Sequence, residues 1–315
     1  MPRVLIIKPS SLGDIIHGLQ VAQSLRTQWP AVEVDWVAAK MFAPLVRQCA
    51  GISRVYEFDR QGSVRAFLDL VGHVRETSYD WALDFQGLAR SAVLLAASRA
   101  RRKARRPDAR EGARWLCRRH AAFPPTGENS HALEILLQFL PLLGLEPRLD
   151  RSPLVFRPPE VSAFPPGLLA SRPVVLFPDS RRAEKEWGGF PALTAKLLEQ
   201  RPNLPIAWAG RHGPAPDPSW PAGRFWNLVG QTPLVTLPAL LASARLVICN
   251  DSGPMHLAAA LGRPVVALFG PTSPDRFGPY PLSAPKHFVV RAPGGDFSRL
   301  DLEAVLPVVM QAVPA

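Results

Sequence analysis

The segment from Asn250 to Thr272, NDSGPMHLAAALGRPVVALFGPT, constrains the fold most, because it combines a polar turn, a small-residue helix and a buried strand. The preceding run 245–249 (RLVIC) is apolar and β-branched, which is typical of a buried parallel strand. Pro254 suits the first turn of a helix over about 254–261, and a second strand is expected over 265–269. The segment therefore predicts an α/β sheet with a ligand site at the carboxyl end of a strand, where helix N–H groups attract phosphate.

Four residues at this strand-to-helix turn are candidate ligand-binding residues: Asp251, Ser252, Gly253 and His256. Asp251 and Ser252 are also good helix-capping residues, and a single helical histidine is more often structural. Capping accounts for one of the two polar residues but not for the whole string, so the segment favours a ligand site.

A second strand, loop and helix are expected at the N-terminus, with a strand over 4–8 (VLIIK) and a helix over 13–25. The loop between them contains Ser10, Ser11, Gly13 and Asp14. It matches neither the three-glycine dinucleotide fingerprint nor the P-loop, which disfavours NAD binding and ATP hydrolysis. Asp14 is either a first-turn acid favoured by the helix dipole or a general base.

Length and composition indicate a folded cytoplasmic protein. The chain has 315 residues, enough for two cores, with 47% hydrophobic and 20% charged residues. It shows no run of about 18 apolar residues and no signal peptide, so neither a membrane helix nor secretion is expected. Cys49, Cys117 and Cys249 are too scattered for a disulfide framework or a zinc site.

A basic cluster over residues 99–119 carries much of the net charge of +11. Ten of its residues are basic against only Asp108 and Glu111: Arg99, Arg101, Arg102, Lys103, Arg105, Arg106, Arg110, Arg114, Arg118 and Arg119. Such a cluster binds an anionic membrane, a polyanionic substrate or nucleic acid, or is simply a solvated surface. Nucleic acid is disfavoured, since no series of stacking aromatics is interleaved and no binding module is recognised. We expect these side chains to be exposed, so that neutralising them barely changes stability.

The chain resembles the family 9 glycosyltransferases, the bacterial heptosyltransferases of the lipopolysaccharide inner core. Four blocks carry the resemblance: KPSSLGD (8–14), LDFQGLARSA (83–92), EKEW (184–187) and the 250–272 string. Within the family, residues 34–45 and 291–300 are most similar to heptosyltransferase I.

The resemblance implies a GT-B architecture, in which two Rossmann-like domains face a central cleft. It implies an acceptor-binding domain over 1–150, a linker over 151–172 and a nucleotide-sugar-binding domain over 173–315. Prolines concentrated in the connector support a stiff linker. The last helix, over about 302–313, is a candidate to pack back on the first domain.

The resemblance also implies the activity, which is inverting transfer of heptose from ADP-heptose to Kdo on lipid A, with Asp14 as the base. Lys185, in the loop after a strand over 173–177, is assigned to the diphosphate. The implied donor-binding residues are Lys185, Asp251, Ser252, Gly253, His256, Ser180, Arg181 and Thr232, and the acceptor-binding residues are Ser10, Ser11, Gly13, Arg60 and Arg110. The loop departs from the family pattern in length and in having Gly188 where a proline is usual.

No metal or cofactor is expected, because the chain lacks an Asp-x-Asp signature. The expected partners are ADP-heptose, Kdo-lipid A and the anionic inner face of the cytoplasmic membrane, with peripheral association and no nucleic acid. Alternatives are another family 9 transferase, such as heptosyltransferase II or one with a different donor, a GT-B-fold sugar-nucleotide epimerase, and a catalytically silent lipid-binding protein.

Overall fold

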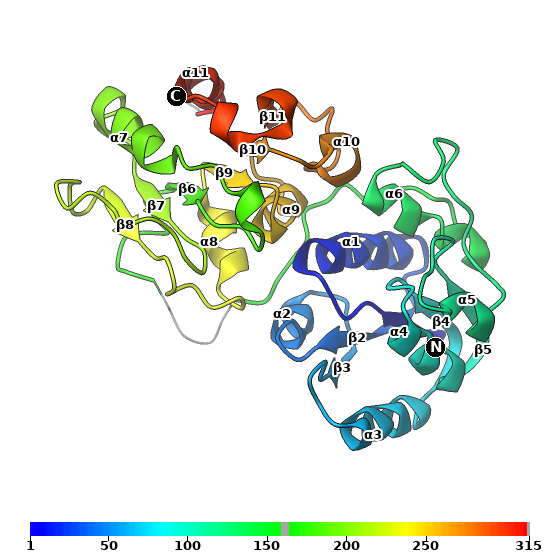
Figure 1. The fold of residues 1–315 in the computed structure, drawn as a ribbon. Coiled ribbons are helices and arrows are strands. Elements are labelled where there is room, and N and C mark those ends of the chain that lie inside the picture. The colour runs from blue at the N-terminus through cyan, green and yellow to red at the C-terminus, as the bar shows by residue number, and fades with distance from the viewer. Residues whose placement is uncertain (159–163, 314–315) are drawn as a thin grey trace. The chain divides into compact units, whose positions relative to one another are not determined.

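The computed structural model describes residues 1–158 and 164–313. The chain divides into two compact units, Met1–Arg157 and Pro158–Ala315, each built around a parallel sheet (Figure 1). Part of the predicted linker (159–163) and the last two residues of the predicted second domain (314–315) lie outside the described residues.

The first unit alternates strands and helices. In order it contains β1 (Arg3–Ile7), α1 (Leu12–Gln28), β2 (Glu33–Ala39), α2 (Ala43–Gln48), β3 (Arg54–Phe58), α3 (Val64–Arg75), β4 (Ser78–Asp84), α4 (Ala89–Ala97), β5 (Arg99–Arg105), α5 (Ala113–Leu116) and α6 (Ala132–Leu137). The strand order is β3-β2-β1-β4-β5, and every pairing is parallel. The order reverses between β1 and β4, and this switch point is where open α/β sheets bind ligands.

Strand alternation decides which way β1 presents its side chains. Leu5 and Ile7 are buried in a cluster with residues of α3 and α4. Val4 and Ile6, also fully buried, point to the opposite face, which α1 covers (Figure 1). Helix α1 approaches closely because residue 18 is glycine: a Cβ there would lie 2.8 Å from Cη2 of Trp36. The N-terminus of α1 is thereby held beside the carboxyl end of β1.

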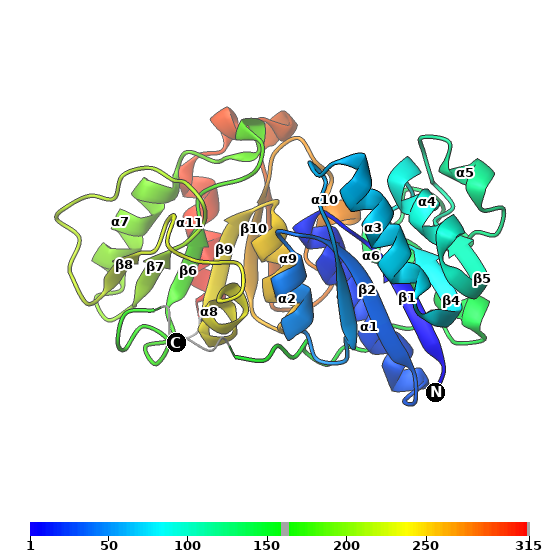
Figure 2. The same cartoon turned by 90° about the horizontal axis from the view of Figure 1, so that it is seen from below.

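The second unit repeats the plan. It contains β6 (Val174–Phe177), α7 (Phe190–Gln200), β7 (Ile206–Trp208), β8 (Phe225–Asn227), α8 (Leu237–Ser243), β9 (Leu246–Asn250), α9 (Gly253–Ala260), β10 (Val265–Phe269), α10 (Pro274–Phe277), β11 (His287–Arg291) and α11 (Leu302–Ala312). The parallel strand order β11-β10-β9-β6-β7-β8 places the switch point between β6 and β9. Figure 2 shows α8 and α9 in front of these strands, with α11 behind them.

The strand, helix and strand predicted from the 250–272 string are confirmed as β9, α9 and β10. Strand β10 has the predicted bounds, and β9 and α9 are displaced by one residue. The continuous burial of β9 and β10 explains why their sequences are apolar without alternation.

Helix α11 packs within the second unit, and its expected return to the first unit stays a prediction. Its buried residues Val305, Val309 and Ala312 lie in the core of the second unit, and the helix contacts β10, β11 and α7. Within residues 1–158 and 164–313, no helix combines the length and apolar character needed to cross a membrane.

Candidate active-site elements

The candidate residues gather at the carboxyl ends of the central strands in each unit. In the first unit Lys8 and Asp14 follow β1, and Gln86 follows β4. In the second unit Ser180 follows β6, and Asp251 follows β9. Each group therefore lies at its own sheet's switch point. The sequence predicted the carboxyl ends of the strands for the loops after β1 and β9, but not the strand order that makes them switch points.

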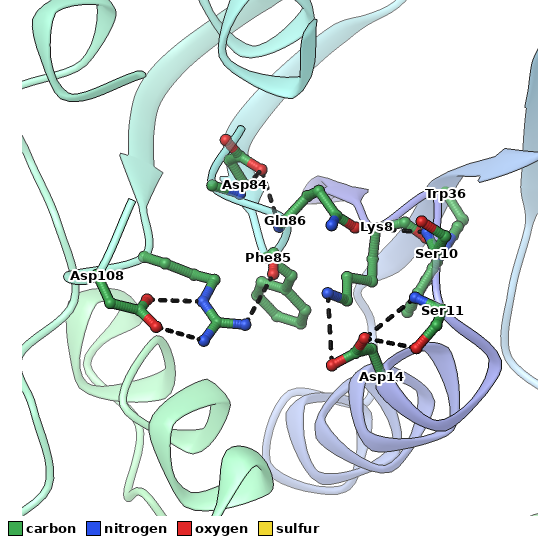
Figure 3. A network of polar contacts seen from close by, with 11 residues as sticks. Lys8, Ser10, Ser11, Asp14, Trp36, Asp84, Phe85, Gln86 and Asp108 are labelled. Carbon is green, nitrogen blue, oxygen red and sulfur yellow. Dashed lines mark hydrogen bonds and ion pairs between the residues drawn. The ribbon is translucent and has the colours of Figure 1, made fainter. Parts of the chain in front are cut away.

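Asp14 is held by its own loop and by a buried lysine (Figure 3). Its Oδ2 accepts hydrogen bonds from the Ser11 backbone N–H at 3.0 Å and from the Ser11 hydroxyl at 2.8 Å. Its Oδ1 lies 3.7 Å from Nζ of Lys8. Asp14 is thus a first-turn acid of α1 with one oxygen bound to Ser11, while the carboxylate keeps 36% of its side-chain surface exposed.

The electrostatics favour an ionised Asp14. Burial by itself raises the pKa of the Asp14 carboxyl, but the Lys8 ammonium and the two Ser11 hydrogen bonds outweigh it, and the pKa lies below its usual value. Burial lowers the pKa of Lys8, whose side chain is only 2% exposed, although Asp14 opposes that shift. The carboxylate is therefore unprotonated and ready to accept a proton at neutral pH.

Sequence reasoning missed Lys8 as a functional residue, although Lys8 begins the KPSSLGD block. Lys8 continues the alternation of β1 toward α1, and its carbonyl accepts a hydrogen bond from Trp36 Nε1 at 3.1 Å. Trp36 is the residue against which Gly18 packs. The hydrogen bond from Trp36 anchors the Lys8 backbone, and nothing in the spacing of the block indicated that the Lys8 side chain lies beside Asp14.

The carboxyl end of β4 adds Asp84 and Gln86 to the polar network around Asp14 (Figure 3). Gln86 Oε1 accepts the Ser10 backbone N–H at 3.4 Å. Asp84, which is fully buried, accepts the N–H groups of Gln86 and Gly87, both at 2.9 Å, and the Ser91 hydroxyl. Burial raises the pKa of Asp84 to about 6 despite these hydrogen bonds. Asp84 therefore organises the loop after β4.

The other predicted acceptor-binding residues, Gly13, Arg60 and Arg110, lie in the same unit as Asp14. Gly13 is buried in the first turn of α1. Arg60 and Arg110 are exposed, as their sequence-based assignment requires. The carbonyl of Arg60 accepts a hydrogen bond from Arg90 at 2.9 Å, and the N–H of Arg110 donates to the Gly87 carbonyl at 2.8 Å. Arg110 is thus tied to the same loop that Asp84 organises.

Lys185 and Asp251 form the centre of the second group. The Lys185 Nζ lies 2.6 Å from Asp251 Oδ2, and both side chains are largely buried, at 16% and 8% exposure. The Thr272 hydroxyl donates to the same oxygen at 2.7 Å. Asp251 thereby positions a cation beside the N-terminus of α9. Thr272 ends the 250–272 string, but nothing in its spacing indicated this contact.

The scaffold beneath the pair comes from Asn250, the last residue of β9. Its Oδ1 accepts the Trp187 N–H at 3.1 Å, and its Nδ2 donates to the Pro178 carbonyl at 3.0 Å. Asn250 thus clamps both ends of the loop that carries Lys185. Ser252 is the N-cap residue of α9, and its buried hydroxyl oxygen has no hydrogen-bond partner within the described residues. Gly253 begins the helix, and His256 is buried one turn in.

The remaining predicted donor-binding residues are distributed differently. Ser180 is buried, and its N–H donates to Glu186 Oε1 at 2.8 Å. Arg181 is exposed. Thr232 lies between β8 and α8, with its hydroxyl donating to the Leu228 carbonyl at 3.2 Å. No hydrogen bond or ion pair among the described residues brings Arg181 or Thr232 to the Lys185–Asp251 pair.

A hollow of about 340 Å³ lies beside the Lys185 loop. Its lining combines the loop residues Ala183, Glu184 and Glu186 with Pro271, Gly295, Asp296, Phe297 and Ser298. Three carboxylates suit the hydroxyl groups of a sugar, which donate hydrogen bonds, better than they suit a phosphate. Within the described residues no three His, Cys, Asp or Glu side chains are grouped to hold a metal ion.

The basic cluster is not the uniformly exposed surface expected from the sequence. Arg105 is buried, and its Nε donates to the Cys117 carbonyl at 2.8 Å. Arg106 forms a two-point pair with Asp108, through hydrogen bonds of 2.8 and 2.7 Å, and favours the ionised form of Asp14. The expectation that all the basic side chains are exposed is therefore wrong for Arg105 and Arg106, while the expected effect of neutralising them on stability stays a prediction. Arg101 and Arg102 are exposed, as expected.

Comparison with known proteins identifies similar chains over nearly the whole length. The model of the family described as glycosyltransferase family 9 (heptosyltransferase) matches residues 67–303. Lipopolysaccharide heptosyltransferase 1 of Escherichia coli O18:K1:H7 is 26% identical over 323 residues, covering 96% of this chain and 95% of that protein. Lipopolysaccharide heptosyltransferase 1 of Pseudomonas aeruginosa is 29% identical over 315 residues, with 88% and 81% covered.

Among solved structures, E. coli heptosyltransferase WaaC with ADP aligns with a TM-score of 0.78 at 24% identity, over 98% of this chain and 99% of that one. This likeness concerns the fold. Together with the two parallel sheets, it confirms the predicted GT-B class with two Rossmann-like domains.

Proposed function

Because the chain belongs to glycosyltransferase family 9, the heptosyltransferases, we propose that it transfers heptose from ADP-heptose to a Kdo residue of lipid A, with inversion at the anomeric carbon. The single observation that supports the chemistry best is Asp14, an ionised carboxylate placed at a switch point beside a buried lysine. The two relatives described above are both named heptosyltransferase 1, which favours the first heptose addition.

In the proposed division of labour, the first unit binds the acceptor and the second binds the nucleotide sugar. The first unit offers Asp14 within a polar loop and exposed arginines for an anionic acceptor. The second offers Lys185 beside the N-terminus of α9, where a cation and unpaired backbone N–H groups suit a diphosphate. The carboxylate-lined hollow next to it suits the sugar hydroxyls.

The proposed reaction is one displacement. The acceptor hydroxyl oxygen of Kdo forms a bond to the anomeric carbon as the bond from that carbon to the diphosphate oxygen breaks. The hydroxyl proton passes to Asp14, and ADP leaves from the opposite face. A carboxylate of low pKa is a weak base, so it accepts the proton late, when the attacking oxygen has already gained positive charge.

Lys185 is proposed to stabilise the negative charge that grows on the departing ADP. Asp251 holds the lysine at 2.6 Å before the donor binds, so the cation is positioned in advance. A pre-positioned charge stabilises the transition state more than a mobile one, because little reorganisation is left to complete. On this proposal Asp251 acts through Lys185, because a carboxylate in contact with the diphosphate would repel it.

The proposed location follows from the acceptor. Lipid A carrying Kdo is membrane-bound, so we infer that the protein works in the cytoplasm and associates peripherally with the inner face of the cytoplasmic membrane. Exposed arginines at the edge of the first unit support attraction to an anionic surface.

The test is ADP release from ADP-heptose in the presence and absence of Kdo-lipid A, with mass analysis of the lipid. The proposal expects release that depends on this acceptor and a lipid heavier by one heptose. Release without acceptor would indicate hydrolysis or epimerisation. Release only with an acceptor that already carries heptose would indicate a heptosyltransferase 2 type of activity.

A further inference from the structure

Two apolar side chains stand exposed inside the basic cluster. Trp115 is 79% exposed and Leu116 is 49% exposed, next to each other in α5 (Ala113–Leu116). The Arg114 guanidinium lies over the Trp115 ring, 5.3 Å from its centroid. Single exposed apolar residues are common, but an adjacent aromatic and aliphatic pair within a cationic surface is a feature of binding sites.

The exposure is built into the loop. Ala113, two residues before Trp115, and Cys117, directly after Leu116, are buried and anchor α5 to the unit. The Arg110 N–H donates to the Gly87 carbonyl at 2.8 Å, and Arg105 Nε donates to the Cys117 carbonyl at 2.8 Å. Both ends of the segment are thus anchored, while the tryptophan and the leucine between them are exposed.

The charges around the pair are almost all positive. Arg110, Arg114, Arg118 and Arg119 are exposed. The one acidic residue among them, Glu111, accepts the Ala89 N–H at 3.1 Å. Arg102 and Arg119 both stack on the ring of buried Trp81, at 5.5 and 5.6 Å, which holds their guanidinium groups at the surface.

The loop also lies at the same edge of the sheet as the candidate base. It leaves and rejoins the carboxyl end of β5, where the N–H of Arg105 donates to the Arg119 carbonyl at 3.1 Å and the N–H of Ala121 donates to the Arg105 carbonyl at 3.0 Å. Asp14 follows the carboxyl end of β1 in the same parallel sheet. Figure 1 shows α5 beside α4 and β5 at this end of the first unit.

We propose that residues 110–119 form a docking loop for an anionic lipid bilayer, with Trp115 and Leu116 entering the interfacial layer and Arg114 and Arg118 pairing with lipid phosphates. Tryptophan favours the membrane interface, and basic residues are attracted to anionic lipid. This inference rests on the proposed function, in which the acceptor is a lipid of that membrane. Docking by this loop presents the Asp14 edge of the sheet to a lipid headgroup.

The experiment measures co-sedimentation of the full chain with phosphatidylcholine vesicles that contain either no phosphatidylglycerol or about a third of it. The test variant is Trp115→Ser with Leu116→Ser. The matched control is Val64→Ser with Leu68→Ser on α3, which removes another exposed apolar pair, 77% and 60% exposed. The charges next to this pair, on Arg65 and Asp69, cancel, so the surface around it is not cationic. A third variant, Arg114→Gln with Arg118→Gln, tests the charges.

The proposal predicts binding of the wild type to the anionic vesicles and at least a tenfold weaker partition for the Trp115/Leu116 variant, with the control unchanged. Each arginine removed is expected to weaken partition about fivefold, the factor equivalent to roughly 1 kcal/mol for a basic residue near the surface. Equal loss in the α3 control, unchanged binding of the Trp115/Leu116 variant, or failure of the wild type to bind would overturn it.

A second readout separates this inference from the proposed function. Activity toward a water-soluble, Kdo-containing acceptor without acyl chains should be unchanged in the Trp115/Leu116 variant, because neither residue touches the candidate site. If the Trp115/Leu116 variant lost both this activity and vesicle binding, the loop would have a structural role, and the docking role would be overturned. Vesicle binding needs no substrate, so it tests docking even if the heptose transfer proposed above fails.

Discussion

Replacing Lys8 with methionine should raise the pKa of Asp14 and move the acid limb of the pH–activity profile upward. The Lys8 Nζ lies 3.7 Å from the carboxylate, and at that separation two unit charges attract by about 4 kcal/mol at an effective dielectric constant of roughly 20 and by about 1 kcal/mol in water. Asp14 keeps 36% of its side-chain surface exposed while Lys8 is buried, so an attraction between these limits applies, roughly 1.5 to 3 kcal/mol. That corresponds to about 1–2 pKa units.

The assay is kcat/KM for acceptor-dependent ADP release between about pH 4 and 8, because kcat/KM reports the groups of the free enzyme. The sign follows from the shift: the pKa of Asp14 is depressed in the wild type, so its ionised form persists to lower pH than in the variant. The variant should lose activity about 1–2 pH units earlier on acidification, with both proteins ionised at Asp14 and folded near pH 7.

Lys40→Met is the matched control, since Lys40 is exposed in the same unit and the chemical change is the same. Its acid limb should coincide with that of the wild type. If the acid limb of Lys8→Met also coincides with the wild type, Lys8 does not tune Asp14, and the electrostatic description of this site is wrong. Removing one partner of an ion pair leaves the Asp14 charge uncompensated and costs stability, so urea unfolding near pH 7 checks that Lys8→Met is folded in the assay.

Three further predictions concern stability and donor binding. Burial raises the pKa of Asp84 from 3.8 to about 6, so between these two pH values the folded state binds a proton that the unfolded state has lost. The free energy of unfolding should therefore fall by about 3 kcal/mol as pH rises from about 4 to about 6. Urea unfolding of Asp84→Asn should lack this decline, which the wild type should show. Lys185→Ala should weaken ADP binding by about 10-fold to 100-fold in calorimetry, as expected for a lost charge-assisted hydrogen bond, and unchanged ADP affinity together with normal turnover would make the lysine structural. Arg106→Gln should lower the free energy of unfolding by about 1–3 kcal/mol, whereas exposed Arg101→Gln should change it by less than about 0.5 kcal/mol; equal effects would show that the pair with Asp108 contributes nothing.

The sequence predicted the parts of the fold that depend on local patterns. Continuous apolar runs bounded by Pro, Gly and polar turns identified β9, α9 and β10, because buried parallel strands and helix ends have local signatures. The resemblance to family 9 glycosyltransferases is confirmed by the family match over residues 67–303. The roles assigned to individual site residues stay predictions.

The contacts that were missed are long-range. The Lys8 backbone is anchored by Trp36, and Asp251 is linked to Thr272 across 21 residues. The exposure of the basic cluster was mispredicted for a different reason. Five of the seven residues of β5 are arginine or lysine, so its sequence has no alternation that could distinguish buried Arg105 from exposed Arg101.

The account depends most on Asp14 as the proton acceptor in heptose transfer. The most direct test is the single-turnover rate of transfer to Kdo-lipid A with saturating ADP-heptose, measured for the wild type and Asp14→Asn alongside ADP affinity by calorimetry. Exposed Asp69→Asn, in the same unit, is the control. The account predicts a rate at least about 100-fold lower for Asp14→Asn, with ADP affinity and the control unchanged. A near-normal rate in Asp14→Asn would contradict it.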